Sequence, residues 1–213
     1  MPANAPNDPA DRALARRLKG LNIYLVGMMG AGKSAVGRPL ARRLGYRFID
    51  ADTTLEQAAG STIPQVFAEQ GEGGFRELET AVLGRIATWH SLVVATGGGV
   101  VAQPVNWGLM HQGVVVWLDA PEGVLLQRLQ ADPTPRPLLQ VADPEARLRK
   151  LLEQRRPLYG QADLHIQQQD GDPGEVADQV IAALPSVLKE RPKPPAQPAQ
   201  LVDRGGEFRP SLN

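Results

Sequence analysis

Short apolar runs alternate along the chain with longer segments whose apolar positions recur at helical spacing. The short runs are rich in β-branched residues and predict strands over residues 22–27, 46–50, 92–96, 114–119 and 164–167. The longer segments predict helices over residues 33–44, 75–89, 121–131, 143–156 and 174–188. Continuously apolar strands separated by helices indicate a parallel sheet with helices on both faces. The pattern therefore predicts a three-layer α/β fold.

The two ends of the chain lack this pattern. Residues 1–20 have no apolar signal core, and residues 189–213 are rich in proline and poor in apolar residues. We expect a flexible N-terminal leader over residues 1–20, in which a short helix can begin at Asp11, and one folded domain over residues 21–188. Residues 189–213 are expected to be a disordered tail.

Charge and composition narrow the class of protein. Lys plus Arg and Asp plus Glu number 23 each, so no overall field would attract nucleic acid or an anionic membrane. Without cysteine the chain has no disulfide or thiolate chemistry, and its three histidines lack metal-ligand spacing. No apolar run approaches the roughly 18 residues of a membrane span. We expect a cytoplasmic protein whose anion sites are local.

The most specific motif follows the first predicted strand. Gly27, Gly32, Lys33 and Ser34 match the pattern G-x-x-x-x-G-K-[ST], with a strand before it and a helix after it. Glycines let backbone N–H groups turn toward phosphate oxygens, Lys33 can reach the outer phosphates, and Ser34 can offer its hydroxyl to Mg²⁺. The motif predicts a nucleoside triphosphate site, but it does not say where the phosphate goes.

Two further stretches follow predicted strands, at the sheet edge where parallel sheets bind ligands. Asp50 and Asp52 lie two residues apart, so one carboxylate can serve a metal ion while the other accepts a proton. The alternative is an ordinary loop, or a helix cap at Asp52. The three glycines of residues 97–99 let a substrate lie against the backbone, or else form a flexible turn.

Three arginines are candidates for anion binding. Arg76 is predicted near a helix start, where its charge opposes the helix dipole, and it can either pair with Glu79 or meet an anion. Arg136 lies in a proline-bracketed loop that is either a lid or a plain linker. Arg155 lies near a predicted helix end, where an arginine can be solvated or functional.

Taken in order, these stretches resemble shikimate kinase. The resemblance covers nearly all of residues 21–188 and rests on GMMGAGKSAVGRPLA, FIDADTTLE, GEGGFRELE, TGGG, RPLL and RRPLY. It implies the P-loop fold of nucleoside monophosphate kinases, with a five-stranded parallel sheet, a helical substrate-binding region and a mobile lid. It also implies a monomer that transfers the γ-phosphate of ATP to the 3-hydroxyl of shikimate, a step of aromatic amino-acid biosynthesis.

The resemblance also implies roles for single residues. Lys33, Asp52 and Arg136 would act in catalysis, and Ser34 and Asp50 would serve Mg²⁺. Shikimate would be bound by Asp52, Arg76, Gly98, Gly99 and Arg155. The nucleotide would be bound by Gly30, Ala31, Gly32, Lys33, Ser34, Ala35 and Arg136.

The chain departs from the family pattern in two places, and two other functions stay open. After RRPLY the chain continues directly with GQAD, and the lid segment matches the family only in RPLL. Arg128, which lies outside that match, is a candidate for packing against adenine. One alternative is a kinase of the same fold that acts on gluconate or a nucleotide. The other is a nucleotide-dependent binding module whose acceptor site has decayed.

Overall fold

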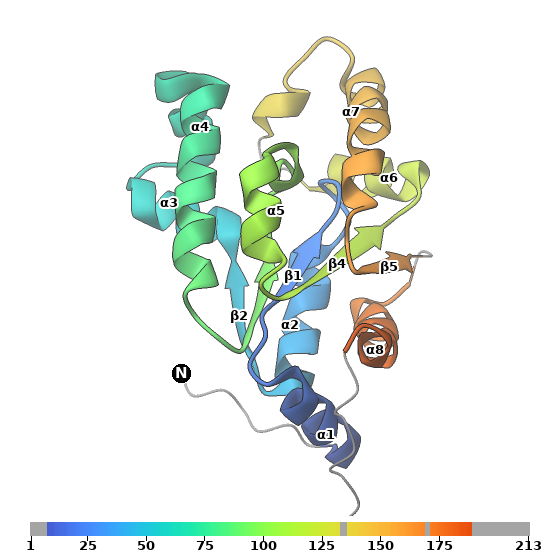
Figure 1. Ribbon diagram of the computed structural model, residues 1–213. Helices are drawn as coiled ribbons and strands as arrows, with labels where there is room; N and C mark the ends of the chain where they lie inside the picture. Colours follow the sequence, from blue (N-terminus) through green and yellow to red (C-terminus); the bar gives the residue numbers. More distant parts are fainter. Residues whose placement is uncertain (1–7, 133–135, 169–170, 189–213) are drawn as a thin grey trace, which may run out of the picture.

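The computed structural model describes residues 8–132, 136–168 and 171–188. Within these ranges, the strands are β1 (Ile23–Val26), β2 (Arg47–Asp50), β3 (Leu92–Ala95), β4 (Val114–Asp119) and β5 (Leu164–Gln167). They form one parallel sheet in the order β2-β3-β1-β4-β5 (Figure 1). The predicted parallel sheet is confirmed, and each strand lies within one residue of its predicted bounds.

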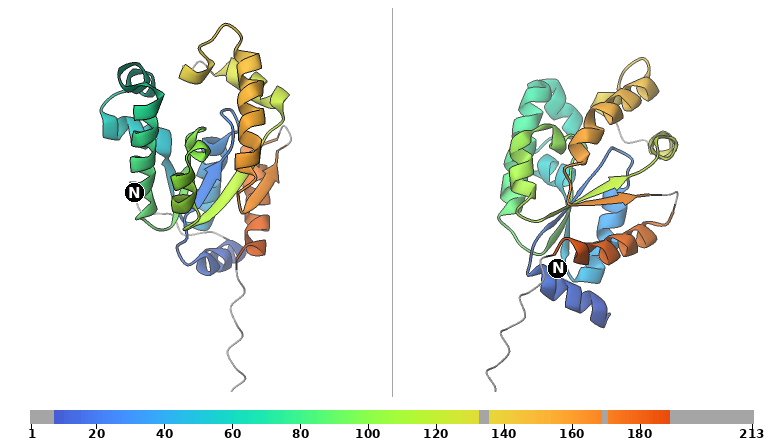
Figure 2. Two further views of the ribbon diagram at one scale, coloured as in Figure 1. Left: turned by 45° about the horizontal axis from the view of Figure 1, so that its top comes forward. Right: turned by 45° about the vertical axis from the view of Figure 1, so that its right-hand side comes forward.

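Helices cover both faces of this sheet (Figures 1 and 2). One face carries α1 (Pro9–Leu18), α2 (Lys33–Leu44) and α8 (Pro173–Ala183). The other face carries α4 (Ile63–Ala87), α5 (Pro104–Met110) and the end of α7 (Pro144–Tyr159). The remaining helices are α3 (Ala51–Ala59) and α6 (Glu122–Ala131), with short 3₁₀ turns η1 (Val100–Ala102), η2 (Pro137–Leu139) and η3 (Leu184–Ser186). The three-layer α/β architecture is therefore confirmed.

The central strand β1 supplies both halves of the core. Ile23 and Leu25 belong to the apolar cluster under α2 and α8, whereas Tyr24 and Val26 belong to the cluster under α4 and α5. Alternate residues of a strand point to opposite faces, so a strand between two helical layers has to be apolar at every position. This explains why the inner strands β1, β3 and β4 are buried at every position, whereas the edge strands β2 and β5 keep exposed or partly exposed positions.

Helix α1 differs from the flexible leader that we expected over residues 1–20. Leu14 and Leu18 lie four residues apart, which places them on one face of the helix, and both are buried in the cluster under α2 and α8. Burial of this apolar face holds the helix on the domain. Our expectation of a disordered tail over residues 189–213 lies outside the described residues.

An ion-pair network fastens α1 at the base of the sheet. Asp11 is almost fully buried and accepts from Nε and Nη2 of Arg43 in α2 at 2.8 and 2.9 Å. The same guanidinium pairs with Asp178 of α8. One arginine therefore joins three helices.

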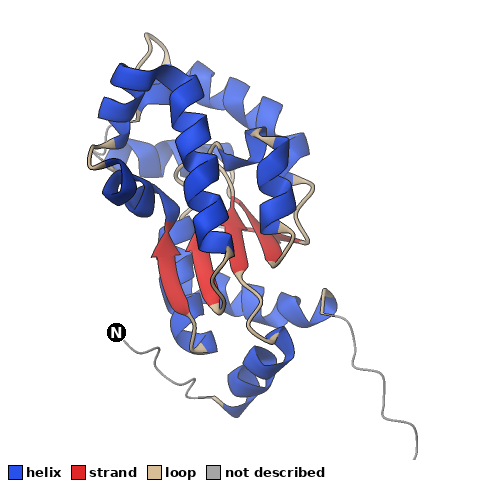
Figure 3. Ribbon diagram, turned by 60° about the vertical axis from the view of Figure 1, so that its left-hand side comes forward, coloured by secondary structure: helices blue, strands red, loops and turns tan. Residues whose placement is uncertain are grey.

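Helices beyond the carboxyl ends of the strands form the part of the molecule that holds the site (Figure 3). Neither α3 nor α5 was among our predicted helices, and α4 begins well before the predicted residue 75. Gly71, with φ 68° and ψ −174°, interrupts the helical geometry of α4. None of the helices in the described ranges is both long and apolar enough to cross a membrane.

Candidate active site

The loop between β1 and α2 forms the predicted phosphate cradle. Gly30 and Gly32 have φ angles of 80° and 78°, in the left-handed region that favours glycine, and Gly32 is the N-cap of α2. A cavity of about 320 Å³ lies over this loop. Its lining includes Gly30, Gly32, Lys33, Ser34, Ala35, Asp50, Asp52, Thr96, Arg128 and Arg136. The cavity thus lies at the positive end of a helix, where anions bind well.

Ala31 is the exception among the residues predicted to bind the nucleotide. It is fully buried and is not part of the cavity lining. Its N–H donates to the carbonyl of Met28 at 3.0 Å, and its carbonyl accepts from Nε2 of Gln168 at 2.7 Å. In this structure Ala31 therefore shapes the loop and does not point a donor into the cradle.

Lys33 brings a partly buried positive charge to the cradle. Its Nζ donates to the carbonyls of Gly27 and Met28 at 2.9 and 3.1 Å. Burial lowers the pKa of Lys33 to about 8, and the nearby Asp52 carboxylate opposes this shift in part. The lowered pKa reflects the poor solvation of the ammonium group, and poor solvation favours its pairing with an incoming phosphate.

Ser34 and Asp50 lie side by side at the edge of the cradle. The hydroxyl of Ser34 donates to Oδ2 of Asp50 at 2.5 Å. Oδ1 of Asp50 accepts from the backbone N–H groups of Asp52 and Thr53, so Asp50 is the N-cap of α3. The helix cap that we considered for Asp52 is real, but it belongs to Asp50. A hydroxyl and a carboxylate are the hard oxygen donors that Mg²⁺ prefers.

Asp52 stands between the cradle and a second cavity of about 610 Å³. It lies in the first turn of α3, and burial raises the pKa of its carboxyl despite the opposing charge of Lys33. The second cavity is formed mainly by α3, α4, the loop of residues 97–99 and η2. The lining residues that the two cavities share are Met29, Asp50, Asp52, Gly98 and Arg136.

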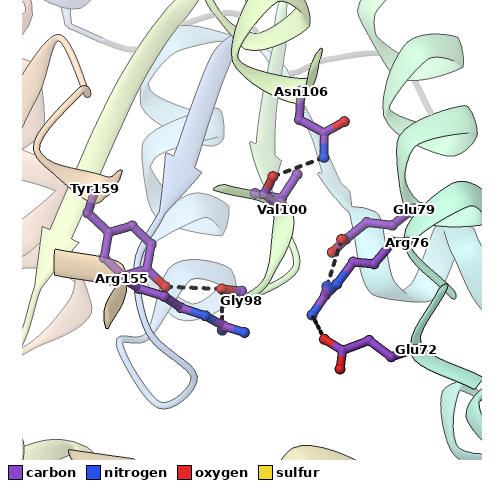
Figure 4. Close-up of polar contacts among 8 residues, drawn as sticks. All are labelled: Glu72, Arg76, Glu79, Gly98, Val100, Asn106, Arg155 and Tyr159. Atoms are coloured by element: carbon purple, nitrogen blue, oxygen red, sulfur yellow. Dashed lines mark hydrogen bonds and ion pairs between the residues drawn. The ribbon is translucent and has the colours of Figure 1, made fainter. Parts of the chain in front are cut away.

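Arg76 is buried and lines the second cavity, and Figure 4 shows its guanidinium group between Glu72 and Glu79. Its Nη1 donates to Oε2 of Glu79 at 2.9 Å, and its Nη2 donates to Oε1 of Glu72 at 3.1 Å. We had considered an ion pair with Glu79 or an anion site for Arg76. The ion pair is present, and Arg76 also faces a cavity that an anion could enter. Burial raises the pKa of Glu79, and Arg76 opposes that shift. Among the described residues, Oε1 of Glu79 has no hydrogen-bond partner.

The three consecutive glycines do not play equal parts. A Cβ on Gly97 would lie 2.8 Å from Oδ1 of Asp52, and a Cβ on Gly99 would lie 2.5 Å from Cζ of Arg76. On Gly98, the nearest atom would be the backbone nitrogen of Met29, at 3.6 Å. Gly97 and Gly99 thus make room for the chain's own side chains, and Gly98 borders open space.

Arg155 enters the same cavity from α7. Its Nη1 donates to the Gly98 carbonyl at 2.9 Å, and the hydroxyl of Tyr159 donates to the same oxygen at 3.0 Å (Figure 4). Both side chains are buried. Arg155 is therefore not a solvent-exposed arginine at a helix end, which was the alternative interpretation.

Arg136 lies at the mouth of both cavities, next to residues 133–135 of the predicted lid, which are outside the described residues. Its Nη2 pairs with Oδ2 of Asp132 at 2.6 Å, and its buried Nε has no partner within the described ranges. Arg128 donates from Nη1 to the carbonyl of Gly30 at 3.3 Å, which places it against the cradle.

Three residues of the site were absent from our predictions. Glu72 was not considered, although it stands four residues before Arg76, the spacing of a helical ion pair. Tyr159 stands four residues after Arg155, and this spacing puts both on one side of α7. Asn106 carried no sequence signal. Its Nδ2 donates to the carbonyl of Val100 at 2.9 Å and so holds the turn after the glycines (Figure 4).

Comparison with known proteins agrees with this geometry. The sequence model of the shikimate kinase family matches residues 29–185. The shikimate kinase of Synechococcus sp. (strain CC9605) is 59% identical over 177 residues, which cover 83% of this chain and 89% of that protein. This chain belongs to the shikimate kinase family. The shikimate kinase of Nostoc punctiforme is 51% identical over 173 residues, which cover 81% of this chain and 95% of that protein.

Solved structures of shikimate kinases share the fold. The shikimate kinase from Acinetobacter baumannii in complex with shikimate has a TM-score of 0.77 and 43% identity, covering 81% of this chain and 97% of that one. Membership of the shikimate kinase family identifies the chain as an ATP-dependent kinase with a P-loop fold. This favours an enzyme over the binding module that we kept as an alternative.

Proposed function

We propose that the chain transfers the γ-phosphoryl group of ATP to the 3-hydroxyl of shikimate, giving shikimate 3-phosphate and ADP. The observation that carries the proposal is the meeting of the cradle and the 610 Å³ cavity at Asp52. One cavity suits a triphosphate, and the other offers buried arginines to a carboxylate and buried carboxylates to hydroxyl groups. A small polyhydroxy acid such as shikimate has both kinds of group.

On the nucleotide side, Lys33 and Arg136 neutralise the negative charge that spreads over the transferring phosphoryl group. Ser34 and Asp50 would hold Mg²⁺, since both present hard oxygen donors at the cradle edge. When bound, Mg²⁺ would neutralise part of the negative charge on the phosphate groups. The backbone around Gly30 and Gly32 surrounds the phosphates.

On the acceptor side, Arg76 and Arg155 bind the carboxylate of shikimate. Both are buried, which strengthens a charge-assisted hydrogen bond relative to one in water. Gly98 leaves space for the ring to lie against the backbone, whereas Gly99 accommodates the guanidinium of Arg76. Oε1 of Glu79, which has no hydrogen-bond partner in the described part of the chain, can accept a hydrogen bond from a ligand hydroxyl.

Asp52 handles the reacting hydroxyl. The acceptor oxygen forms a bond to the γ-phosphorus while the bond from that phosphorus to the β–γ bridging oxygen breaks. Asp52 accepts a hydrogen bond from the attacking hydroxyl and, late in the step, its proton. Its raised pKa makes it a better base than an exposed aspartate. Most of the acceleration then comes from positioning two reactants and stabilising charge.

A coupled ADP-release assay with shikimate, gluconate and AMP as alternative acceptors tests the proposal. We expect turnover with shikimate that far exceeds the rate with the other two. Asp52→Asn should lower kcat by roughly 10²–10⁴-fold, the usual contribution of a positioned general base. ATP affinity, measured by calorimetry, should survive. Absence of turnover with shikimate, or faster turnover with gluconate, would contradict the proposal.

We propose further that the chain works as a monomer in the cytoplasm. Both cavities are lined with the charged groups that the mechanism needs, so the site requires no residue from a second copy, and the zero net charge offers no attraction to nucleic acid or membranes. Analytical ultracentrifugation at assay concentration tests the monomer. A dimer that dissociates with loss of activity would contradict it.

A further inference from the structure

Two side chains of α7 donate to a single oxygen atom. Nη1 of Arg155 and the hydroxyl of Tyr159 reach the Gly98 carbonyl at 2.9 and 3.0 Å (Figure 4). A carbonyl oxygen has two lone pairs, so these two bonds saturate it. Gly97, Gly98 and Gly99 all line the second cavity, here called the acceptor cavity, and Gly98 is the one of the three where a Cβ would meet no atom closer than 3.6 Å.

Arg155 and Tyr159 differ in how readily each can give up its hydrogen bond to the Gly98 carbonyl. Arg155 lines the acceptor cavity, and its bond to a carboxylate would be stronger than its bond to a neutral carbonyl. The ring of Tyr159 is fully buried and stacks on Trp117 at a centroid distance of 5.7 Å. Burial raises the pKa of Tyr159 to about 12, so its hydroxyl remains a donor at physiological pH.

The support of Tyr159 extends to the edge of the sheet. The ring of Trp117 also stacks on His165 of β5, at a centroid distance of 4.0 Å. Asp119 of β4 bonds to His165 at 3.0 Å and to Arg156 of α7 at 3.3 Å. The end of α7 is thereby fixed to β4 and β5, which keeps the tyrosine in place whatever Arg155 does.

We propose that Arg155 exchanges the Gly98 carbonyl for the acceptor carboxylate when the acceptor binds, and that Tyr159 holds the carbonyl throughout. Without the phenol, this exchange leaves a partly buried carbonyl oxygen with neither of its two protein donors, and acceptor binding weakens by that cost. Tyr159 is therefore a positioning residue for acceptor binding that acts through Gly98 and Arg155. The inference rests on the proposed role of Arg155 in holding the acceptor carboxylate.

Tyr159→Phe tests the inference because it removes the hydroxyl and keeps the stacked ring. We expect the KM for shikimate to rise about fivefold to tenfold, with kcat and the KM for ATP nearly unchanged. Tyr24→Phe is the matched control. Tyr24 is equally buried in the same apolar cluster, and its hydroxyl contacts Asn22, away from both cavities. This control should leave both KM values unchanged.

A double-variant cycle separates this inference from the proposed function. In an Arg155→Ala background no exchange occurs, so adding Tyr159→Phe should not raise the shikimate KM further. If Arg155→Ala alone leaves the shikimate KM normal, the proposed acceptor site is wrong. If Arg155→Ala raises that KM but Tyr159→Phe does not, only the exchange is wrong. A rise from Tyr159→Phe that is equal with and without Arg155 also overturns the exchange.

Discussion

Replacing Gly99 by alanine perturbs the acceptor site without removing any functional side chain. The new Cβ would lie 2.5 Å from Cζ of Arg76, whereas ordinary contacts begin near 3.4 Å, so the guanidinium has to withdraw. That movement disrupts the 2.9 Å bond from Arg76 to Glu79. The backbone at Gly99 has φ −101° and ψ −5°, which alanine can adopt. The strain therefore falls on the ion pair.

The size of the effect follows from the burial of this pair. Arg76 and Glu79 are 7% and 5% exposed, and removing one partner from a buried ion pair costs about 3–5 kcal/mol. Because Gly99→Ala displaces Arg76 and does not delete it, we expect a loss of about 2–3 kcal/mol. At about 2–4 °C per kcal/mol for a domain of this size, Tm should fall by about 4–12 °C. The shikimate KM should rise as well.

Gly98→Ala is the matched control for this variant. Its Cβ meets no atom closer than 3.6 Å, so the thermal melt should stay close to that of the original chain. The methyl group would still occupy acceptor space, so the KM for shikimate should rise, and by more than the KM for ATP, because Gly98 lines both cavities. Differential scanning calorimetry and steady-state kinetics measure both properties. An unchanged Tm for Gly99→Ala, or a larger Tm loss for Gly98→Ala, would refute the reasoning.

Three further predictions concern the charged groups. Arg76→Ala and Arg155→Ala should each weaken shikimate binding by about 2–5 kcal/mol, seen as a higher KM for shikimate with the KM for ATP unchanged. If both variants keep a normal KM for shikimate, neither arginine belongs to the acceptor site. Lys33, with its pKa lowered to about 8 from 10.5, binds fewer protons when folded, so its contribution to stability should rise between pH 8 and pH 10.5. ATP binding near pH 8 should then take up protons, which calorimetry in two buffers detects, and Lys33→Met should abolish that uptake. Asp11→Asn should lower Tm by a few degrees, because a partly exposed pair contributes about 1 kcal/mol, and an unchanged melt would show that the pair does not stabilise α1.

The inner strands β1, β3 and β4 were predictable from the sequence because burial on both faces leaves a signal at every position. Helices α3 and α5 gave weaker signals. Residues 51–59 look like a polar loop after a strand, and α5 is a short helix that contains Gly108. The glycines of GEGG also disguised the first half of α4, where the chain tolerates Gly71 at a break in the helix. In these three segments the local composition favoured loops, but tertiary packing stabilises helices.

In the site, the sequence motifs indicated which residues gather, but not how they support each other. Lys33, Asp52 and Arg76 stand in recognisable stretches. The two hydrogen bonds to the Gly98 carbonyl come from side chains 57 and 61 positions away in the sequence, and no local spacing predicts such a contact. The same holds for the glycines of residues 97–99, whose lack of a side chain leaves space for Asp52 and Arg76 as well as for a ligand. Contacts between distant segments are what the structure adds.

The arginine that joins α1, α2 and α8 has a consequence for synthesis of the protein. Arg43 and Asp178 are 135 positions apart, so at about 5–20 residues per second the ribosome adds Asp178 roughly 7–27 s after Arg43. During that interval α1 and α2 can meet through Asp11, but the apolar surface that α8 covers stays open. The base of the domain is thus the last part to close on the nascent chain. It is the surface on which we expect chaperones to act.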